Sequence, residues 1–320
     1  MRFITPYFTD KRVCVTGGAG FLGRVVCAQL KEQGVGHLFV PRSKDFDLTQ
    51  SAAVARMLDE AAPHIVIHLA AEVGGIGANR ENPGRFFYAN MAMGLHLIEE
   101  SRRRGIDKFV QVGSVCAYPK ACPVPFREES LWAGYPEETN ASYGVAKRAL
   151  GVMLESYRRQ YGFNGIHLLP VNLYGPGDNF DLETAHVIPA MIRKFQAAVQ
   201  SRLGIVTCWG TGRSTREFLY VDDAAEAIVT ATARYNDSAP INLGSGREIF
   251  IADLAALISR LVGFEGRIEW DHARPDGQPR RRLDTQRAGE RLGWTARVDL
   301  EDGLRRTIDW WRANPQSRQG

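Results

Sequence analysis

The feature that most constrains this 320-residue chain is a glycine-rich turn between a short apolar run and an amphipathic segment. The turn reads Thr16-Gly17-Gly18-Ala19-Gly20-Phe21-Leu22-Gly23 and follows the β-branched run Arg12 to Thr16. Glycine permits a tight turn and close backbone approach, and the first N–H groups of a helix have no partner within that helix. A strand, this turn and a helix, in that order, predict the first βα unit of a parallel sheet with an anion site at the helix N-terminus.

Strand-length and helix-length segments then alternate through the first half of the chain. The predicted strands are Arg12 to Thr16, His37 to Val40, Ile65 to Leu69, Phe109 to Val112 and Ile166 to Pro170. The predicted helices are Gly20 to Gln33, Ala52 to Ala61, Gly84 to Arg104 and Tyr143 to Tyr161, followed by Val187 to Gln200, Asp222 to Tyr235, Ala252 to Leu261 and Leu300 to Arg312.

This pattern predicts an α/β protein, with a doubly wound parallel sheet of the Rossmann type and a smaller C-terminal α/β domain for the substrate. We assign residues 1–180 plus about 217–247 to the dinucleotide-binding domain, and about 181–216 plus 248–320 to the substrate domain. Ligands of such sheets bind beyond the carboxyl ends of the strands, so the chemistry is expected there.

Composition excludes several classes of protein. A net charge of +4 is too small to predict nucleic-acid binding, although Arg274 and Arg280 to Arg282 form a local basic group suited to the phosphates of a small ligand. No apolar run is long enough for a membrane span, and Met1 to Asp10 lack a signal-peptide pattern, so we expect a cytoplasmic protein. Five cysteines without CxxC spacing predict neither a disulfide framework nor a metal site, and Cys14, Cys27 and Cys208 read as buried apolar residues.

The spacing of Gly17, Gly20 and Gly23 is G-x-x-G-x-x-G, which is typical of short-chain dehydrogenases and predicts a dinucleotide cofactor. With the turn we include Phe21 and Leu22, and we expect Ala70 to line the same site. After the second strand, Arg42 and Lys44 suit a 2′-phosphate, which favours NADP(H), whereas Asp45 and Asp47 leave NAD open. Asp47 and Leu48 are expected beside the adenine.

Three residues predict carbonyl chemistry. Tyr143 and Lys147 are four residues apart and share one face of a predicted helix, where the ammonium is expected to lower the pKa of the phenol. Ser114 follows the fourth strand, at the sheet edge where the nicotinamide should rest. Together they resemble the catalytic triad of short-chain dehydrogenases, in which serine and tyrosine hold the carbonyl oxygen during hydride transfer.

Longer motifs narrow the resemblance to one family. They are His68-Leu-Ala-Ala-Glu-Val-Gly-Gly-Ile76, Gly113-Ser-Val-Cys-Ala-Tyr-Pro-Lys120, Asn172-Leu-Tyr-Gly-Pro176, Asp178-Asn-Phe180, His186-Val-Ile-Pro189, Trp209-Gly-Thr-Gly212, Arg216-Glu-Phe-Leu219 and Pro275-Asp-Gly-Gln-Pro-Arg280. Matches extend from about residue 12 to residue 310, and the chain resembles GDP-L-fucose synthases. The resemblance implies inversion of carbons 3 and 5 of GDP-4-keto-6-deoxy-mannose, followed by reduction of the ketone with NADPH.

Further site residues follow from this resemblance. Cys116 and His186 match the family's pair of proton-transfer groups, and a neighbouring cation would raise the thiolate fraction of Cys116. The substrate set is Asn172, Lys194, Trp209, Arg216 and Arg280, with Trp209 on the base and Arg216 and Arg280 on the diphosphate. This chain departs from the family at Val115, Glu72 and Lys194, where serine, lysine and arginine are usual.

Those departures leave the sugar open. A GDP-linked 6-deoxyheptose or another 4-keto sugar nucleotide would also fit, with one half-reaction lost, as in a pure 4-ketoreductase or a pure epimerase. A non-catalytic dinucleotide-sensing protein is the alternative outside enzymes. The resemblance also implies a homodimer that pairs the helices Gly84 to Arg104 and Tyr143 to Tyr161.

Overall fold

The computed structural model describes residues 6–74, 76–274 and 276–314; Met1 to Thr5, Gly75 and Pro275, which fall in segments discussed above, lie outside them. In the described chain the largest sheet has six strands in the order β2-β1-β3-β4-β5-β9, and every pair is parallel. The strands are β1 (Arg12–Thr16), β2 (His37–Phe39), β3 (Ile65–His68), β4 (Lys108–Val112), β5 (Gly165–Pro170) and β9 (Ile241–Leu243). The order reverses between β1 and β3, which is where ligands of doubly wound sheets bind.

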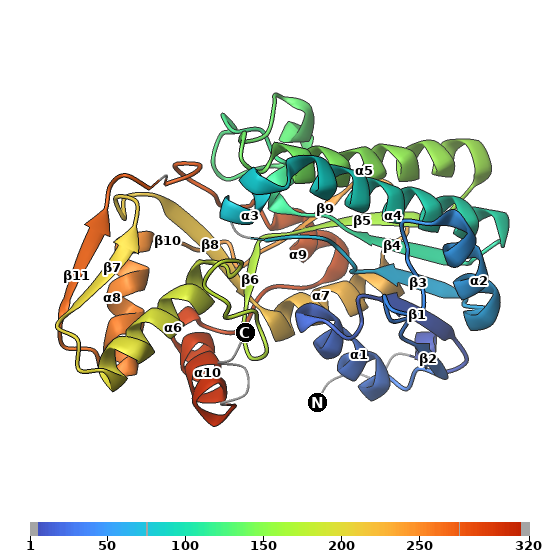
Figure 1. The fold of residues 1–320 in the computed structure, drawn as a ribbon. Helices are drawn as coiled ribbons and strands as arrows, with labels where there is room; N and C mark the ends of the chain where they lie inside the picture. The colour runs from blue at the N-terminus through green and yellow to red at the C-terminus, as the bar shows by residue number, and fades with distance from the viewer. Residues whose placement is uncertain (1–5, 75, 275, 315–320) are drawn as a thin grey trace.

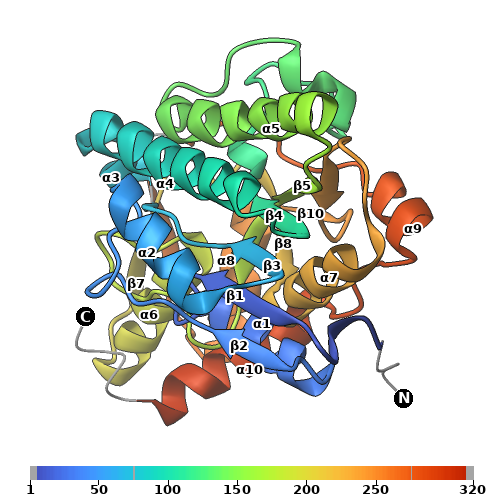
Figure 2. The ribbon, with the colours of Figure 1, turned by 90° about the vertical axis from the view of Figure 1, so that its right-hand side faces the viewer.

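Helices cover both faces of this sheet (Figures 1 and 2). One face carries α1 (Phe21–Glu32) and α7 (Val221–Arg234), and the other carries α2 (Ser51–Ala61), α4 (Pro83–Arg103) and α5 (Ala141–Tyr161). β4 and β5 are buried along their whole length, because strands covered on both faces have no solvated side. The predicted α/β class and parallel sheet are confirmed.

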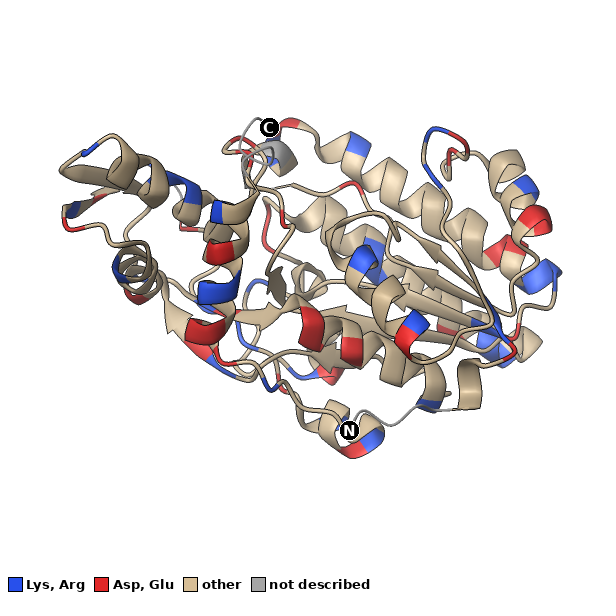
Figure 3. Cartoon of the chain, turned by 90° about the horizontal axis from the view of Figure 1, so that it is seen from below, with Lys and Arg blue, Asp and Glu red and all other residues tan. Residues whose placement is uncertain are grey.

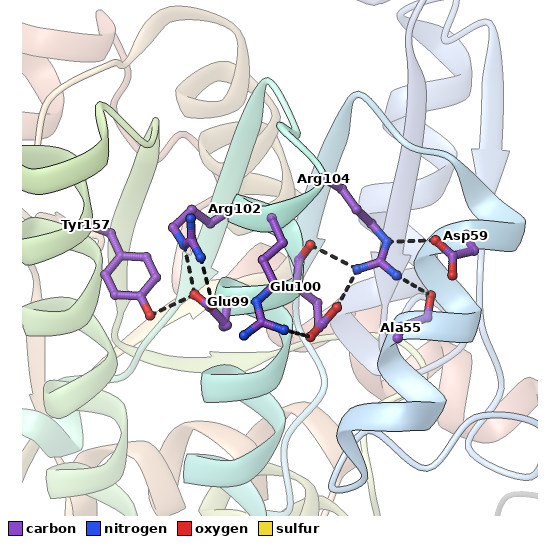
Figure 4. A network of polar contacts seen from close by, with 8 residues as sticks. Ala55, Asp59, Glu99, Glu100, Arg102, Arg104 and Tyr157 are labelled. Atoms are coloured by element: carbon purple, nitrogen blue, oxygen red, sulfur yellow. Dashed lines mark hydrogen bonds and ion pairs between the residues drawn. The ribbon is translucent and has the colours of Figure 1, made fainter.

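Helix α4 is held between α5 and α2 by polar contacts (Figure 4). The Glu99 carboxylate accepts hydrogen bonds from Arg102 Nη2 (2.8 Å) and from the Tyr157 hydroxyl of α5 (2.9 Å). Arg104 Nε donates to Asp59 of α2 at 2.8 Å. Hydrogen bonds from Arg102 lower the pKa of Glu99 to about 2.

A smaller α/β part follows the main sheet and lies to its left in Figure 1. Its strands are β6 (Asn172–Tyr174), β8 (Thr215–Tyr220) and β10 (Glu248–Phe250) in one sheet, and the parallel pair β7 (Ile205–Trp209) and β11 (Arg267–Asp271). The helices α6 (Val187–Gln200), α8 (Ile251–Val262) and α10 (Leu300–Ala313) pack around a second apolar core that includes Phe195, Leu254 and Trp311. The chain also forms α3 (Ile76–Glu81) and α9 (Gln286–Leu292).

The sequence predicted the main elements to within a few residues. β1 and α6 have the predicted bounds, whereas α5 begins at Ala141, before Tyr143. Strand β9 of the main sheet, the short strands of the smaller part, and α3 and α9 were not individually predicted, because most of them are too short to show a clear periodicity.

Acidic and basic residues are interspersed along the surface helices (Figure 3). On α10, Arg305 pairs with Glu301 and Arg306 with Asp302, each one helical turn apart. Among the described residues, no helix is long and apolar enough to cross a membrane, and no cluster of His, Cys, Asp or Glu could hold a metal ion. Cys14, Cys27 and Cys208 are buried as predicted, whereas Cys116 is only partly buried.

Candidate active site

The glycine-rich turn lies at the reversal point between β1 and β3. Gly17 has φ +72°, and a Cβ on it would lie 2.7 Å from the backbone nitrogen of Ala70, just past β3. A Cβ on Gly23 would lie 2.1 Å from the Gly17 carbonyl oxygen. Gly20 is the N-cap of α1, so the unpaired N–H groups of that helix begin at Phe21 and Leu22. This bare backbone at a helix N-terminus suits the pyrophosphate of a dinucleotide.

The loop after β2 lies beside this turn because β2 pairs with β1. Arg42 and Lys44 are exposed on it. Asp47 Oδ1 accepts hydrogen bonds from the Thr49 hydroxyl (2.7 Å) and backbone nitrogen (3.0 Å), which lower its pKa. Leu48 is buried. Among the described residues, neither Arg42 nor Lys44 has an ion-pair partner, whereas the Asp47 carboxylate already accepts hydrogen bonds from Thr49.

Ser114, Tyr143 and Lys147 are brought together at the carboxyl end of β4. Ser114 follows β4, and its hydroxyl accepts the Cys116 N–H at 3.2 Å and hydrogen-bonds with the Tyr143 phenol. Lys147 Nζ lies 5.8 Å from the centre of the Tyr143 ring and donates to the Val112 carbonyl oxygen at 3.3 Å. Only the fold places Ser114 beside two residues that are some thirty positions away in sequence.

The expected lowering of the Tyr143 pKa is wrong for this structure. Burial raises the pKa of Tyr143, with a further increase from Cys116, and the hydrogen bond with Ser114 opposes them only in part. Burial also lowers the pKa of Lys147 to about 8. Removal of water therefore outweighs the attraction between ammonium and phenolate, and Tyr143 is a phenol that can donate a proton at neutral pH.

Cys116 lies between an amide and a guanidinium. Its Sγ accepts from Arg281 Nη1 at 3.7 Å and lies 3.9 Å from the Asn140 Oδ1 atom. Arg281 is buried, and its Nε donates to Gln278 Oε1 at 3.2 Å. A Cβ on Gly144 of α5 would lie 2.2 Å from the Cys116 carbonyl oxygen, so α5 packs directly on the cysteine backbone.

His186 is the N-cap residue of α6, on the smaller part of the molecule. His186 is exposed to solvent, although surrounding protein atoms still desolvate the charged form of its imidazole. This desolvation, and second the charge of Arg281, lower the pKa of His186. The arginine that contacts Cys116 therefore also acts electrostatically on His186, which was predicted from a separate motif.

The predicted substrate residues differ in how far their side chains are already engaged by contacts within the protein. Arg216 donates to the backbone oxygens of Gln278 (2.6 Å) and Asp276 (2.8 Å), and burial lowers its pKa to about 9. Arg280 pairs with Glu248, so its charge is already balanced. Arg216 thus holds the loop that carries Arg281.

The remaining substrate residues lie on β6, β7 and α6. Lys194 Nζ and the Arg274 guanidinium lie 5.5 and 4.8 Å from the centre of the half-exposed Trp209 ring. Asn172 Nδ2 donates to the Glu217 carbonyl oxygen at 3.2 Å. Trp209 is therefore an aromatic platform bordered by two cations.

Two features at the site were not predicted. Arg281 and Asn140 are the polar contacts of Cys116, but only the basic group Arg280 to Arg282 signalled the first, and no motif signalled the second. Glu72, where the family usually has lysine, forms an ion pair with Arg85 at 2.7 Å. Glu72 therefore has a partner of opposite charge nearby. It lines a pocket of about 400 Å³, and Thr184 is another lining residue of that pocket.

Comparison with known proteins decides the family. Residues 13–244 match the NAD dependent epimerase/dehydratase family. Over 307 residues the chain is 40% identical to GDP-L-fucose synthase 1 of Arabidopsis thaliana, which covers 96% of this chain and 95% of that protein. The chain belongs to the GDP-L-fucose synthase family. The resemblance inferred from the motifs is confirmed, and this family member is an enzyme.

Solved structures agree with this family assignment. A GDP-6-OMe-4-keto-L-xylo-heptose reductase from Campylobacter jejuni matches with a TM-score of 0.89 at 29% identity, covering 96% of this chain and 99% of that one. A GDP-L-fucose synthetase from Naegleria fowleri bound to NADP gives 0.86 at 27% identity, covering 95% and 94%. GDP-L-fucose synthases and a GDP-heptose reductase thus share the fold of this family member.

Proposed function

We propose that this enzyme converts GDP-4-keto-6-deoxy-mannose to GDP-L-fucose, by 3,5-epimerisation and then reduction of the 4-ketone with NADPH. The observation that carries the proposal is a link between two sets of groups through Arg281. Ser114, Tyr143 and Lys147 serve a carbonyl, while Cys116 contacts the same Arg281 whose charge acts on His186. Membership of the family supports both half-reactions.

In the reduction, Ser114 and Tyr143 donate hydrogen bonds to the ketone oxygen. NADPH, held at the glycine turn of Gly17, Gly20 and Gly23, would supply the hydride that reduces carbon 4. Tyr143 gives its proton to the oxygen as negative charge develops there, which the raised pKa of its buried phenol permits at neutral pH. Lys147, beneath the ring, stabilises the phenolate that remains.

In the epimerisation, the same two hydroxyls hold the oxygen of the enolate. Carbons 3 and 5 flank the carbonyl, so their C–H protons are acidic enough for a protein base. The Cys116 sulfur removes a proton from one face, and His186 delivers one to the other. The Arg281 guanidinium, whose Nη1 lies 3.7 Å from Sγ, stabilises the thiolate form of Cys116 that accepts this proton.

The residues around the glycine turn fit a dinucleotide. Gly17, Gly20 and Gly23 leave room for the pyrophosphate at the α1 N-terminus, and a side chain on Gly17 or Gly23 would collide with backbone. Arg42 and Lys44, exposed on the loop after β2, would hold a 2′-phosphate, which makes NADPH the preferred cofactor. The NADP-bound relative from Naegleria fowleri supports this choice. Equal kcat/KM values for NADPH and NADH would contradict it.

We assign the nucleotide to the smaller part of the molecule. Trp209, with Lys194 and Arg274 at its ring, would stack on the base, and Arg216 would act on the diphosphate while it holds its loop. Asn172 lines the sugar end, and Arg280 would have to exchange Glu248 for phosphate. The division into residues 1–180 plus about 217–247 and about 181–216 plus 248–320 belongs to the same proposal. Phe218 and Tyr220, however, pack in the core of the smaller part.

The deciding experiment incubates the protein with NADPH and a panel of GDP-linked 4-keto sugars and determines the ring stereochemistry of each product by NMR. GDP-L-fucose from the mannose derivative is the expected result. A second candidate is reduction of a GDP-4-keto-heptose, which the structural match to the Campylobacter jejuni reductase favours. Turnover of the heptose alone would select it, and no NADPH oxidation with any sugar would leave a dinucleotide-sensing role.

We also propose a homodimer that pairs α4 and α5 with their copies. These helices pack side by side over the sheet, and their exposed apolar residues include Tyr88, Leu95 and Val152. Such side chains on adjacent helices suit a symmetric interface. Sedimentation should give twice the 35.6 kDa of one chain, and a monomer at micromolar concentration would refute the proposal.

A further inference from the structure

Four polar side chains lie in a row across the main sheet, directly beneath the catalytic helix. The strand register pairs Thr16 with His68, His68 with Gln111, and Gln111 with His167. Register partners in parallel strands project from the same face. That face is the one under α5, because a Cβ on Gly151 of α5 would lie 2.4 Å from His167 Nδ1. All four side chains are buried.

Lys147 of α5 contacts the same backbone carbonyl group as Gln111 of this row. The Val112 carbonyl oxygen accepts both Lys147 Nζ (3.3 Å) and Gln111 Nε2 (2.9 Å). His167 Nε2 lies against Gly113, the residue after Val112, since a Cβ on Gly113 would be 2.4 Å from this nitrogen. Burial lowers the pKa of His68 well below its usual value and that of His167 to about 4, and the charge of Lys147 adds to both effects. Both imidazoles are therefore neutral and close to the ammonium.

Three atoms of this row have no hydrogen-bond partner among the described residues: His68 Nε2, Gln111 Oε1 and His167 Nε2. The only side-chain pairing within the row is Thr16 Oγ1 with His68 Nδ1, at 2.7 Å. Buried polar atoms in native proteins are almost always satisfied, and internal water is the usual partner where protein supplies none. Lys147 has three N–H donors, and Val112 accepts one of them.

We propose that internal water joins the Lys147 ammonium to His167 Nε2 and Gln111 Oε1, so that His167 is a positioning residue for Lys147. The neutral imidazole keeps the ammonium charged and in place below the Tyr143 ring. The role in catalysis rests on the proposed function, whereas the contact itself does not. The titratable groups facing Lys147 are Tyr143 on its own helix, His68 on β3 and His167 on β5; Cys116 lies beyond Tyr143, and β4 adds the neutral Gln111.

The contact is tested without turnover by ¹⁵N NMR of the full chain labelled at histidine, with His167 assigned from a His167→Leu sample. In Lys147→Met the Nε2 signal should move toward that of an unbonded nitrogen, and the imidazole should protonate at higher pH. Lys108→Met is the matched control, because Lys108 is equally buried but contacts Asn236 near α7 instead. A His167 signal unchanged by Lys147→Met, or changed equally by both variants, would overturn the proposal.

The role in catalysis is tested by the pH dependence of kcat for ketone reduction. Lys147 must stay protonated, so the rate should fall above about pH 8, where its lowered pKa lies. His167→Leu should move this fall to lower pH by about 0.5 to 1 unit, and His167→Asn, which keeps an acceptor, should restore it. A fall at the wild-type pH in His167→Leu would reduce His167 to a packing residue. If no sugar is reduced while the NMR signal still responds to Lys147, the proposed function fails and the contact stands.

Discussion

Replacement of Arg281 by glutamine should slow proton exchange at the sugar far more than it affects binding of the cofactor. Glutamine keeps a hydrogen-bond donor near Cys116 but removes the charge. Two unit charges at the 3.7 Å that separates Nη1 and Sγ attract by about 4 kcal/mol at the effective dielectric of a partly buried site. Cys116 is only partly buried, so water will replace some of this interaction.

We expect about 2–3 kcal/mol to be lost from stabilisation of the sulfur anion, which corresponds to a decrease of roughly 30- to 150-fold in rate. The assay measures deuterium incorporation at carbons 3 and 5 in D₂O, alongside NADPH binding. Arg281→Lys should recover much of the rate, because the charge returns. The pKa of His186 should rise in Arg281→Gln, since the arginine is one of the two causes that lower it.

Arg282→Gln is the matched control: it removes the neighbouring arginine from the same loop, but only Arg281 contacts the sulfur. Wild-type exchange rates in Arg281→Gln would refute the role of its charge. Equal slowing in both variants would instead indicate that the loop had moved.

Three further predictions follow from the structure. Tyr143→Phe should lower the rate of NADPH oxidation by about 10²-fold or more while NADPH still binds, and near-normal turnover would place the proton donor elsewhere. Cys116→Ser should yield reduced sugar with uninverted carbons, detected by NMR, because Ser114, Tyr143 and Lys147 remain; product inverted at both carbons would return Cys116 to a packing role. Glu99→Gln should lower the free energy of unfolding by about 1–2 kcal/mol at pH 7 after allowance for screening, measured by urea denaturation. The pKa of Glu99 is about 2 when folded, so its stabilisation exists above about pH 4.5 and is lost as the pH falls toward 2; the variant should show a smaller loss over that interval, and an identical loss would exclude Glu99.

The sequence predicted those parts of the molecule that local signals determine. The glycine turn, β1 and α1 are contiguous, and Tyr143 and Lys147 lie on one helical turn. Their joint position followed from the rule that parallel strands end at one edge.

Electrostatic details depend on contacts distant in sequence, and the sequence did not predict them. Three consecutive arginines give no indication of which one faces the cysteine; Gln278 and Arg216 decide it by holding the loop. Burial of Tyr143 reversed the expected direction of its pKa shift. Glu248, thirty-two positions earlier, pairs with Arg280 and was not part of the predicted site.

The contact between Gly144 and the Cys116 carbonyl bears on how this enzyme could acquire new substrates. Gly144 adjoins Tyr143, and Cys116 follows Ser114 by two residues. Because Gly144 has no Cβ, helix α5 approaches the Cys116 backbone closely, and this approach sets the separation of Tyr143 from Cys116. A change in the position of either Tyr143 or Cys116, made to fit a different sugar, would therefore also move the other residue. Changes in sugar preference should therefore accumulate at positions away from this contact that hold neither His186 nor Arg281 in place.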